Sequence, residues 1–254
     1  MFEGLRRALL GYAEKDGRGY PDWALRYVPI VERLGARVRG GERILEIGAN
    51  ENGLSRFARV RVIAADASLE HLKAARTSQD VIPVVCDMAA LPFGNRCFSV
   101  CVCVDTFEHA SGGTRDVAAA EIVRVLRQDG VAVISFPAGT GAHRAEAAIR
   151  EAYRRYTGST INWLEEHLAE GLPDPAALAG RFAELTQDSH RVMQTKNGSL
   201  WVWRWMWLVL MCGWPGRGNA IFQAVLRGIT PVLCRIHIGP CYRTVIWVEP
   251  KDAG

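Results

Sequence analysis

The sequence predicts an α/β protein built on a doubly wound, largely parallel sheet of seven strands. Five short runs rich in Val and Ile follow residue 42, and each is apolar without alternation: RILEIG, VRVIAAD, VIPVVCD, FSVCVCVD and VAVISFP. Strands of this kind are covered on both faces, which is typical of a parallel sheet. Segments of helical length separate the runs at 53–58, 68–78 and 114–128. Alternating strands and helices form right-handed βαβ units, so this order predicts a doubly wound domain.

Helices are expected on both sides of this core. Residues 2–38 have the pattern of two amphipathic helices separated by the turn GRGYPD. After Pro137, three segments have helical periodicity, AHRAEAAIREAYRRYTG, STINWLEEHLAEGL and DPAALAGRFAELT, with Ser159 and Asp174 as expected N-caps. A strand at 190–195, a Trp-rich stretch at 200–212, a helical piece at 219–230 and a final strand, YRTVIWVEP, follow. We therefore expect one domain over 1–254, with an N-terminal cover (1–40), a core (41–137) and a substrate-side part (138–254).

The composition excludes several classes of protein. The 254 residues are 49% hydrophobic and 23% charged, which is ordinary for a globular protein. A net charge of +4 is too weak to indicate a nucleic-acid partner. The seven cysteines form no CxxC pair or metal-like spacing, which predicts reduced thiols in a cytoplasmic protein. The N-terminus lacks a signal-peptide pattern, and the apolar stretch 200–211 is shorter than the roughly 20 residues that span a bilayer.

The first strand and the turn after it have the pattern of a nucleoside-binding site. The strand ILEI leads into GANENG, and the second strand ends at Asp66, at about the spacing of 20 residues from Gly48 that is usual for such an acid. Glycine lets the backbone approach a ligand closely, and an acid at the tip of the second strand accepts hydrogen bonds from ribose hydroxyls. The order of strand, glycine turn, helix, strand and acid therefore predicts a bound nucleoside.

Five motifs in this order resemble those of class I S-adenosylmethionine-dependent methyltransferases of the small-molecule, methyltransferase type 11-like kind. They are LEIGANENG, the acid Asp66 at the end of the second strand, VVCDMAALPF, FSVCVCVDTFEH and EIVRVLRQDGVAVISFP, and they span about residues 41–137. The resemblance implies a Rossmann-like seven-stranded sheet whose last strand, YRTVIWVEP, is reversed. It also implies methyl transfer with S-adenosylmethionine as cofactor. The cofactor-binding residues that it implies are Glu46, Gly48, Ala49, Asn50, Asp66, Ala67, Asp87, Met88 and Asp105.

The glycine turn departs from the family pattern. Asn50 and Asn52 stand where the family has glycine, and Gly53 follows one place later. Asn adopts a left-handed backbone more readily than other non-glycine residues, so we expect the turn to form with less room for the cofactor. A chain that keeps the fold but has lost cofactor binding is the alternative.

The segment DTFEH carries the candidate catalytic chemistry. If it opens a helix, Asp105, Glu108 and His109 share a face at the carboxyl end of the fourth strand, where open α/β sheets bind ligands. His109 is then a candidate general base. The same three side chains could hold a divalent cation, since they resemble the site of some quinone-ring O-methyltransferases. A third interpretation is that Glu108 and His109 only shape the pocket wall.

The C-terminal third is expected to select the acceptor, a small or lipid-linked molecule methylated at oxygen rather than nitrogen. The candidate acceptor contacts are Tyr153, Tyr156, Trp163, His167 and His190. Residues 198–236 combine tryptophan and arginine, which a membrane interface favours, and we expect a helical insertion there that touches a bilayer peripherally. The other interpretation is that these tryptophans form the core of a helical cap or a homodimer interface.

Three other functions remain open from the sequence. An NAD(P)-dependent oxidoreductase shares the glycine turn and the acid, but it usually has a fuller GxGxxG and a hydride-transfer set such as Tyr and Lys. A non-catalytic cofactor-binding protein would keep the fold without turnover. A membrane-peripheral subunit would act mainly through residues 198–236.

Overall fold

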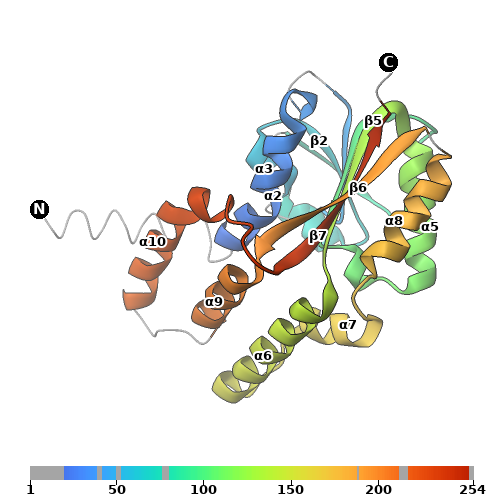
Figure 1. Cartoon of the computed structure of the whole chain (residues 1–254). Coiled ribbons are helices and arrows are strands. Elements are labelled where there is room, and N and C mark those ends of the chain that lie inside the picture. The colour runs from blue at the N-terminus through green and yellow to red at the C-terminus, as the bar shows by residue number, and fades with distance from the viewer. Residues whose placement is uncertain are drawn as a thin grey trace, which may run out of the picture.

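A seven-stranded sheet lies at the centre of the molecule, with the strand order β3-β2-β1-β4-β5-β7-β6 (Figure 1). The computed structural model describes residues 20–38, 42–49, 53–75, 80–187, 189–211 and 217–251. The strands are β1 (Ile44–Ile47), β2 (Val62–Asp66), β3 (Val81–Val85), β4 (Phe98–Val104), β5 (Leu126–Pro137), β6 (His190–Ser199) and β7 (Cys241–Pro250). The α-helices are α2 (Tyr20–Leu34), α3 (Leu54–Ala58), α4 (Leu69–Ala75), α5 (Gly112–Val125), α6 (Gly139–Thr157), α7 (Asn162–Glu170), α8 (Pro175–Thr186), α9 (Leu200–Met211) and α10 (Arg217–Leu233); η1 (Gly35–Val38) and η2 (Phe107–His109) are 3₁₀ helices.

Strands β1 to β5 are parallel, and β7 runs antiparallel between β5 and β6. This topology confirms the predicted doubly wound sheet with a reversed last strand. The chain leaves β1 toward β2 on one side and returns beside β1 as β4 on the other. The carboxyl ends of β1 and β4 therefore border the crevice at which doubly wound sheets bind their ligands.

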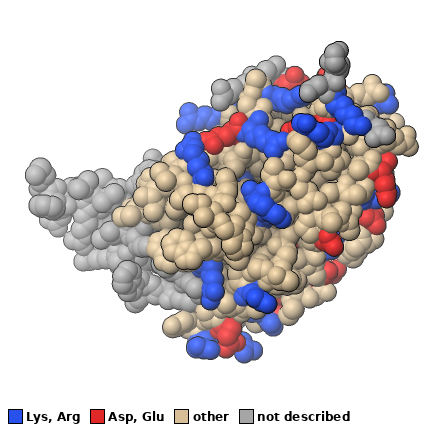
Figure 2. Space-filling view, viewed as in Figure 1, with Lys and Arg blue, Asp and Glu red and all other residues tan. Residues whose placement is uncertain are grey.

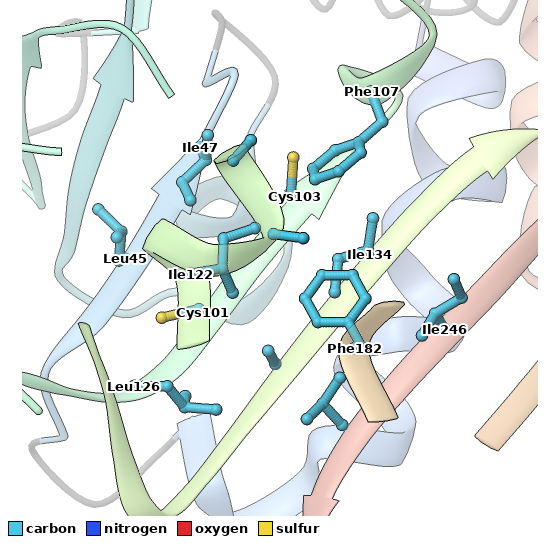
Figure 3. Close-up of a cluster of buried hydrophobic side chains, with 14 of the residues drawn as sticks. Leu45, Ile47, Cys101, Cys103, Phe107, Ile122, Leu126, Ile134, Phe182 and Ile246 are labelled. Carbon is cyan, nitrogen blue, oxygen red and sulfur yellow. The ribbon is translucent and has the colours of Figure 1, made fainter. Parts of the chain in front are cut away.

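Helices cover both faces of the sheet, as the continuously apolar strands predict (Figure 1). Ile122 of α5 and Phe182 of α8 pack on one face with Leu45 and Cys101 (Figure 3). On the opposite face, α2, α3 and α4 contribute Tyr27, Ile30, Leu34, Leu54 and Leu72 to a second apolar cluster. Both faces of β1 and β4 are thus removed from water. This burial of apolar side chains stabilises the two strands at the centre of the sheet.

A third apolar cluster joins the helices at one end of the sheet. It includes Leu25 of α2, Ile149 of α6, Leu164 of α7 and Trp203 of α9. The indole of Trp203 stacks on Tyr242 of β7 with ring centroids 3.5 Å apart. Helices α9 and α10 lie between β6 and β7 in the chain, which is where the sequence predicts a helical insertion. In the part of the chain that the structure describes, no helix is both long and apolar enough to cross a membrane.

Several predicted boundaries differ from the structure. The first predicted helix, in residues 2–19, lies outside the described residues. Helix α2 begins inside the predicted turn, because Pro21 in a first helical turn needs no N–H partner. The helix predicted over 114–128 ends at Val125, since Leu126 already pairs with Phe98 of β4.

The two predicted N-caps have different outcomes. Asp174 caps α8, where its carboxylate accepts the backbone N–H of Ala176 at 2.8 Å. The Ser159 prediction is wrong, because α7 begins after Ile161.

In Figure 2, Lys and Arg are most numerous along the upper edge of the face shown, where Asp and Glu lie among them, and fewer of them are scattered over the rest of this face.

Candidate functional site

A pocket of about 1290 Å³ opens at the carboxyl ends of β1, β2 and β4. Its floor is the sheet edge, and α2, α7 and α9 supply its other walls. Ligand sites for one drug-sized molecule usually measure roughly 300–1,000 Å³. The volume is therefore large enough for a cofactor and a second molecule side by side.

The turn after β1 requires glycine at the pocket edge. Gly48 has φ +73°, and a Cβ at this position would overlap the side chain of Thr106. The N–H of Gly48 donates to the carbonyl of Ala65 at 2.8 Å, which ties the turn to β2. The backbone therefore passes along the pocket with no side chain between it and a ligand, which is the form that a nucleoside site requires.

Glu46 supports this turn from behind. The sequence predicts Glu46 and Ala49 as cofactor contacts, but neither residue lines the pocket. Both Glu46 carboxylate oxygens accept the N–H of Leu54, at 2.8 and 2.9 Å, and so hold the start of α3. Burial raises the pKa of Glu46 to about 7. The predicted contact Asn50 lies outside the described residues.

Four predicted cofactor residues meet at the tips of β2 and β3. Asp66, Ala67, Asp87 and Met88 all line the pocket. The Asp66 carboxylate accepts the N–H of Ser68 at 2.7 Å, and Asp87 accepts the N–H of Ala89 at 2.8 Å. Local turns thus fix two acids beside the glycine turn, where ribose and base groups would need acceptors.

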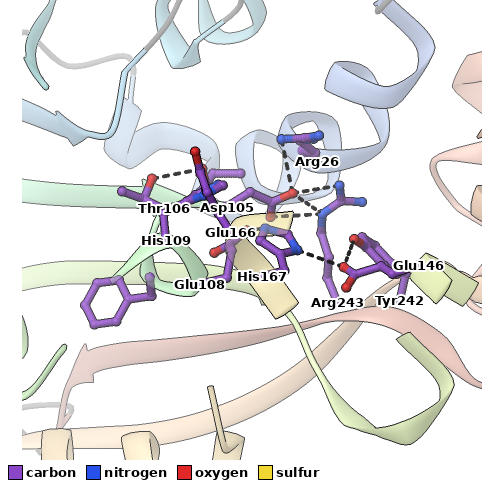
Figure 4. A network of polar contacts seen from close by, with 12 residues as sticks. Arg26, Asp105, Thr106, Glu108, His109, Glu146, Glu166, His167, Tyr242 and Arg243 are labelled. Atoms are coloured by element: carbon purple, nitrogen blue, oxygen red, sulfur yellow. Dashed lines mark hydrogen bonds and ion pairs between the residues drawn. The ribbon is translucent and has the colours of Figure 1, made fainter. Parts of the chain in front are cut away.

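Asp105 forms a buried ion network instead of pointing toward Glu108. It ends β4 with φ +49°. Arg243 of β7 donates through Nε to both Asp105 oxygens, at 2.9 and 2.8 Å, and Arg26 of α2 lies 3.1 Å from Oδ2 (Figure 4). Asp22 pairs with both arginines. Although burial opposes ionisation, Arg243 and Arg26 hold the pKa of Asp105 below its usual range.

This network changes the geometry predicted for DTFEH. The segment does not open a helix at Asp105; a 3₁₀ turn forms over Phe107–His109. Asp105 is directed to the arginines, and His167 of α7 lies beside Glu108 and His109 in its place (Figure 4). The ligand atoms of Glu108, His109 and His167 lie within 4.8 Å of one another.

Each of these histidines is hydrogen-bonded to a carboxylate through Nδ1. His109 Nδ1 lies 2.7 Å from Glu166 Oε2, and His167 Nδ1 lies 3.0 Å from Glu146 Oε1. Burial, and after it the neighbouring His167, lowers the pKa of His109. Its imidazole is therefore neutral at pH 7 and can accept a proton. Burial and the Asp105 carboxylate raise the pKa of Glu108 well above its usual range.

The predicted acceptor contacts divide into two groups. Tyr153, Trp163 and His167 line the pocket. Tyr156 is exposed on α6 away from it, and His190 is buried on β6, where Nδ1 lies 2.9 Å from the Ser189 hydroxyl. Neither of the last two lines the pocket: Tyr156 lies on the exposed side of α6, although Tyr153 of the same helix reaches the pocket, and His190 begins the edge strand β6.

Helix α2 supplies pocket residues that no motif predicts. Asp22, Trp23 and Arg26 line the pocket, and the Arg26 guanidinium lies 4.3 Å from the centroid of the Trp23 ring. The i, i+4 spacing of Asp22 and Arg26 is a sequence signal for a helical ion pair. It does not indicate that the pair faces a binding site.

The fold and this pocket together define a doubly wound α/β protein whose pocket suits a nucleoside beside a second ligand. A family model described as a methyltransferase domain matches residues 45–134. No curated protein matches the chain.

Solved structures share the fold. The chain is similar to one in the complex between the Haloferax volcanii Trm112 methyltransferase activator and a methyltransferase, at 15% identity and TM-score 0.57, with 95% of this chain and 97% of that one covered. It is also similar to the Bacillus subtilis YcgJ protein (17%, TM-score 0.54, 90% and 98% covered). A third is Haemonchus contortus phosphoethanolamine N-methyltransferase 2 in complex with S-adenosyl-L-methionine (17%, TM-score 0.53, 88% and 53% covered).

Residues 45–134 therefore match a methyltransferase domain, and the whole chain shares its fold with solved methyltransferases. The Haemonchus contortus structure holds S-adenosyl-L-methionine on this fold. The assignment replaces the oxidoreductase alternative, and the shared fold explains why the glycine turn and the acid after β2 are common to both classes.

Proposed function

We propose that this methyltransferase methylates a hydroxyl oxygen of a neutral or cationic, partly apolar small molecule. The observation that carries the proposal is the pair of carboxylate-bound histidines, His109 and His167, which line the same pocket as the glycine turn. A hydroxyl must lose its proton as the methyl group arrives, and a neutral imidazole at that point can accept it.

The residues around the glycine turn fit the cofactor. Gly48 brings the backbone to the pocket edge without a side chain, and Asp66 and Asp87 line the same pocket. When bound, S-adenosylmethionine supplies a methyl group on a positively charged sulfur, which is reactive without further activation. The task left to the protein is to place an acceptor atom in line with that methyl group.

The charge of the pocket restricts the acceptor. Among the described lining residues, Arg26 alone carries a permanent positive charge, and Asp22 and Asp105 neutralise it. The wall near His109 instead carries Glu166 and Glu170. A phosphate or carboxylate group would therefore find no free cation among these lining residues. A neutral or amine-bearing acceptor does not need one. Tyr153, Trp163 and Trp207 supply apolar surface for its remaining atoms.

His109 is the proposed proton acceptor. Its Nδ1 is engaged by Glu166, so Nε2 is the nitrogen available to the acceptor hydroxyl. The O–H bond breaks as the new O–CH₃ bond forms, the proton passes to His109, and Glu166 stabilises the resulting imidazolium. An amine acceptor, as the name of the Haemonchus contortus enzyme indicates for that protein, would use the same proton acceptor, and product analysis separates the two.

Calorimetric titration with S-adenosylhomocysteine tests the cofactor site. The Asp66→Ala variant should bind at least tenfold more weakly, because one charge-assisted hydrogen bond to the ribose contributes about 1.5–3 kcal/mol. Asp116→Ala, an exposed acid on α5, is the matched control and should bind as the wild type does. Equal affinity in both variants would contradict the assigned site.

The acceptor site is tested with His109→Gln, which keeps a polar side chain without a titrating ring. With an acceptor found by screening phenols, alcohols and amines, kcat should fall about 10²–10⁴-fold while S-adenosylhomocysteine affinity is unchanged. Mass spectrometry of the product then locates the methyl group. A variant with full kcat would exclude His109 as the proton acceptor.

A further inference from the structure

Three side chains at the acceptor end of the pocket come from two elements and converge on one point. Glu108 and His109 lie on η2, and His167 lies on α7 (Figure 4). His167 Nε2 is 3.9 Å from Glu108 Oε1, and the two histidine rings lie 4.9 Å apart between centroids. Arg115 fixes this juxtaposition, because its guanidinium donates to the backbone carbonyls of Phe107 and Gly171, at the ends of η2 and α7.

Two polar atoms of this cluster are buried without a partner in the described part of the chain. They are Glu108 Oε2 and His167 Nε2. Their residues are only 1% and 3% exposed. Buried polar groups in proteins are nearly always satisfied, so two such atoms facing one point indicate a ligand that binds there.

Both histidines are oriented as metal ligands are. Glu166 engages Nδ1 of His109 and Glu146 engages Nδ1 of His167, which leaves Nε2 of each ring to bind. The Tyr242 hydroxyl donates to Glu146 at 2.6 Å and holds it in place. A carboxylate behind each imidazole is the usual arrangement around a metal-bound histidine, where it sets the tautomer and raises the basicity of the ligand.

We propose that Glu108, His109 and His167 bind one divalent transition-metal cation and that its open coordination position holds the oxygen of the methyl acceptor. Two imidazoles and a carboxylate suit Zn²⁺ or Fe²⁺ in sites that leave a position for substrate. Mg²⁺ and Ca²⁺ prefer oxygen ligands and fit poorly. Ligand atoms at about 2.0–2.2 Å from zinc lie roughly 3.4 Å apart, so the three side chains close by about an ångström on binding.

This set differs in one member from the Asp105, Glu108 and His109 set that the sequence predicts. Both oxygens of Asp105 face Arg243. A second arginine, Arg26, lies on the same carboxylate, so a cation there would meet two fixed positive charges. His167 offers an imidazole nitrogen in the place of Asp105, and its ion-pair partners are Glu108 and Glu146.

The catalytic consequence rests on the proposed function, but cation binding does not. When an acceptor hydroxyl binds the cation, the positive charge favours loss of its proton to solvent. His109 is then a ligand, and the oxygen is already deprotonated when the methyl group reaches it. In the cation-free enzyme the same proton passes to His109.

The test is calorimetric titration of the chelator-treated full chain with Zn²⁺ and, separately, Mg²⁺. We expect one Zn²⁺ per chain at this site, weakened at least 30-fold in Glu108→Gln, His109→Gln and His167→Gln, with no comparable Mg²⁺ binding. His143→Gln, an exposed histidine on α6, is the matched control and should bind like the wild type. Glu146→Gln should weaken Zn²⁺ roughly 10–100-fold through His167.

The comparison between variants defines the site, since free cysteines also bind Zn²⁺. Wild-type Zn²⁺ binding no stronger than that of the Glu108/His109/His167 triple variant would overturn the proposal. Because Glu108 is buried and its variant could unfold, His109→Gln, at the more exposed edge of the cluster, gives the decisive comparison. Equal affinity of His109→Gln and wild type would also overturn it. S-adenosylhomocysteine affinity, measured in the same samples, reports on the proposed function separately.

Discussion

At the scale of single residues, the site depends on positions where backbone conformation and space leave one choice. Gly48 is such a position, because its φ of +73° is unfavourable for other residues and Thr106 occupies the space of a Cβ. Asp105 also has an unusual backbone conformation, with φ +49°. Its left-handed backbone is stabilised by ion pairs to two arginines, and it directs the carboxylate away from Glu108. The cluster beside Glu108 therefore contains the imidazoles of His109 and His167 rather than the Asp105 carboxylate.

Gly48→Ala should destabilise the fold and weaken cofactor binding together. A left-handed backbone costs about 1–2 kcal/mol for a residue with a Cβ, and the overlap with Thr106 adds to this. We expect a loss of at least about 2 kcal/mol in urea unfolding and a tenfold or greater loss of S-adenosylhomocysteine affinity. Gly113→Ala in α5, where a Cβ meets open space, should be neutral or stabilise by up to about 1 kcal/mol. Similar losses in both variants would show that Gly48 has no special role.

At the scale of elements, α9 has two kinds of tryptophan. Trp203 is buried against Tyr242, and Trp207 lines the pocket, whereas Trp201 and Trp205 are exposed. Both interpretations of the Trp-rich stretch thus have residues that suit them: one pair belongs to a helical cap, and the other forms a surface. Helix α10 also exposes apolar side chains, Val225, Ile229 and Val232. The proposal of peripheral membrane contact therefore concerns Trp201 and Trp205.

A Trp201→Ala/Trp205→Ala variant should lose co-sedimentation with vesicles that contain anionic lipid, while its unfolding free energy changes by less than about 1 kcal/mol. An interfacial indole binds through its amphipathic ring, so removing two leaves little to anchor the helix. Tyr156→Ala, an exposed aromatic on α6, is the control. Trp203→Ala should instead cost about 3–5 kcal/mol, because it leaves a cavity beside Tyr242. Equal recovery of wild type and double variant in the supernatant would exclude membrane contact.

The elements were predictable where the physical signal is local. Continuous Val- and Ile-rich runs identify five parallel strands because burial on both faces leaves no polar alternation. Asp174 followed by Pro175 identifies the start of α8, because an N-cap acts only on the backbone N–H groups next to it. The cofactor residues at the strand tips were predictable, and Tyr153, Trp163 and His167 were predicted as acceptor contacts, but the cluster of His167 with Glu108 and His109 was not. His167, Glu166 and Glu146 reach it through the docking of α6 and α7, which depends on apolar contacts such as Ile149 and Leu164 that carry no information about a pocket.

At the scale of the whole molecule, buried charge ties distant parts of the chain together. Arg243, in the last strand, is fully buried and pairs with Asp105 at the end of β4 and Asp22 at the start of α2. These contacts hold α2 and the reversed strand β7 together beside the pocket. A buried arginine in an otherwise apolar strand is a sign in the sequence that acids must meet it, although only the fold determines which acids they are.

Glu46 should make the stability of the whole molecule depend on pH. In the folded state its pKa is about 7, because of burial, whereas an unfolded glutamate titrates near 4.3. The folded state therefore holds a proton that the unfolded state has released. The contribution of Glu46 to stability is complete below about pH 4.3 and is lost as the pH rises through about 7, by on the order of 3 kcal/mol.

Urea unfolding of wild type and Glu46→Gln between pH 4.5 and 8 measures this effect. The variant cannot ionise, so the wild type should lose stability relative to it as the pH rises. Glu121→Gln is the control with the opposite sign. The Arg124 hydrogen bond lowers the pKa of Glu121, so its contribution is already present above about pH 5, and the difference from wild type should stay flat. Parallel stability curves for wild type and Glu46→Gln would mean that Glu46 is ionised throughout, with the two Leu54 hydrogen-bond contacts outweighing the cost of burying its charge.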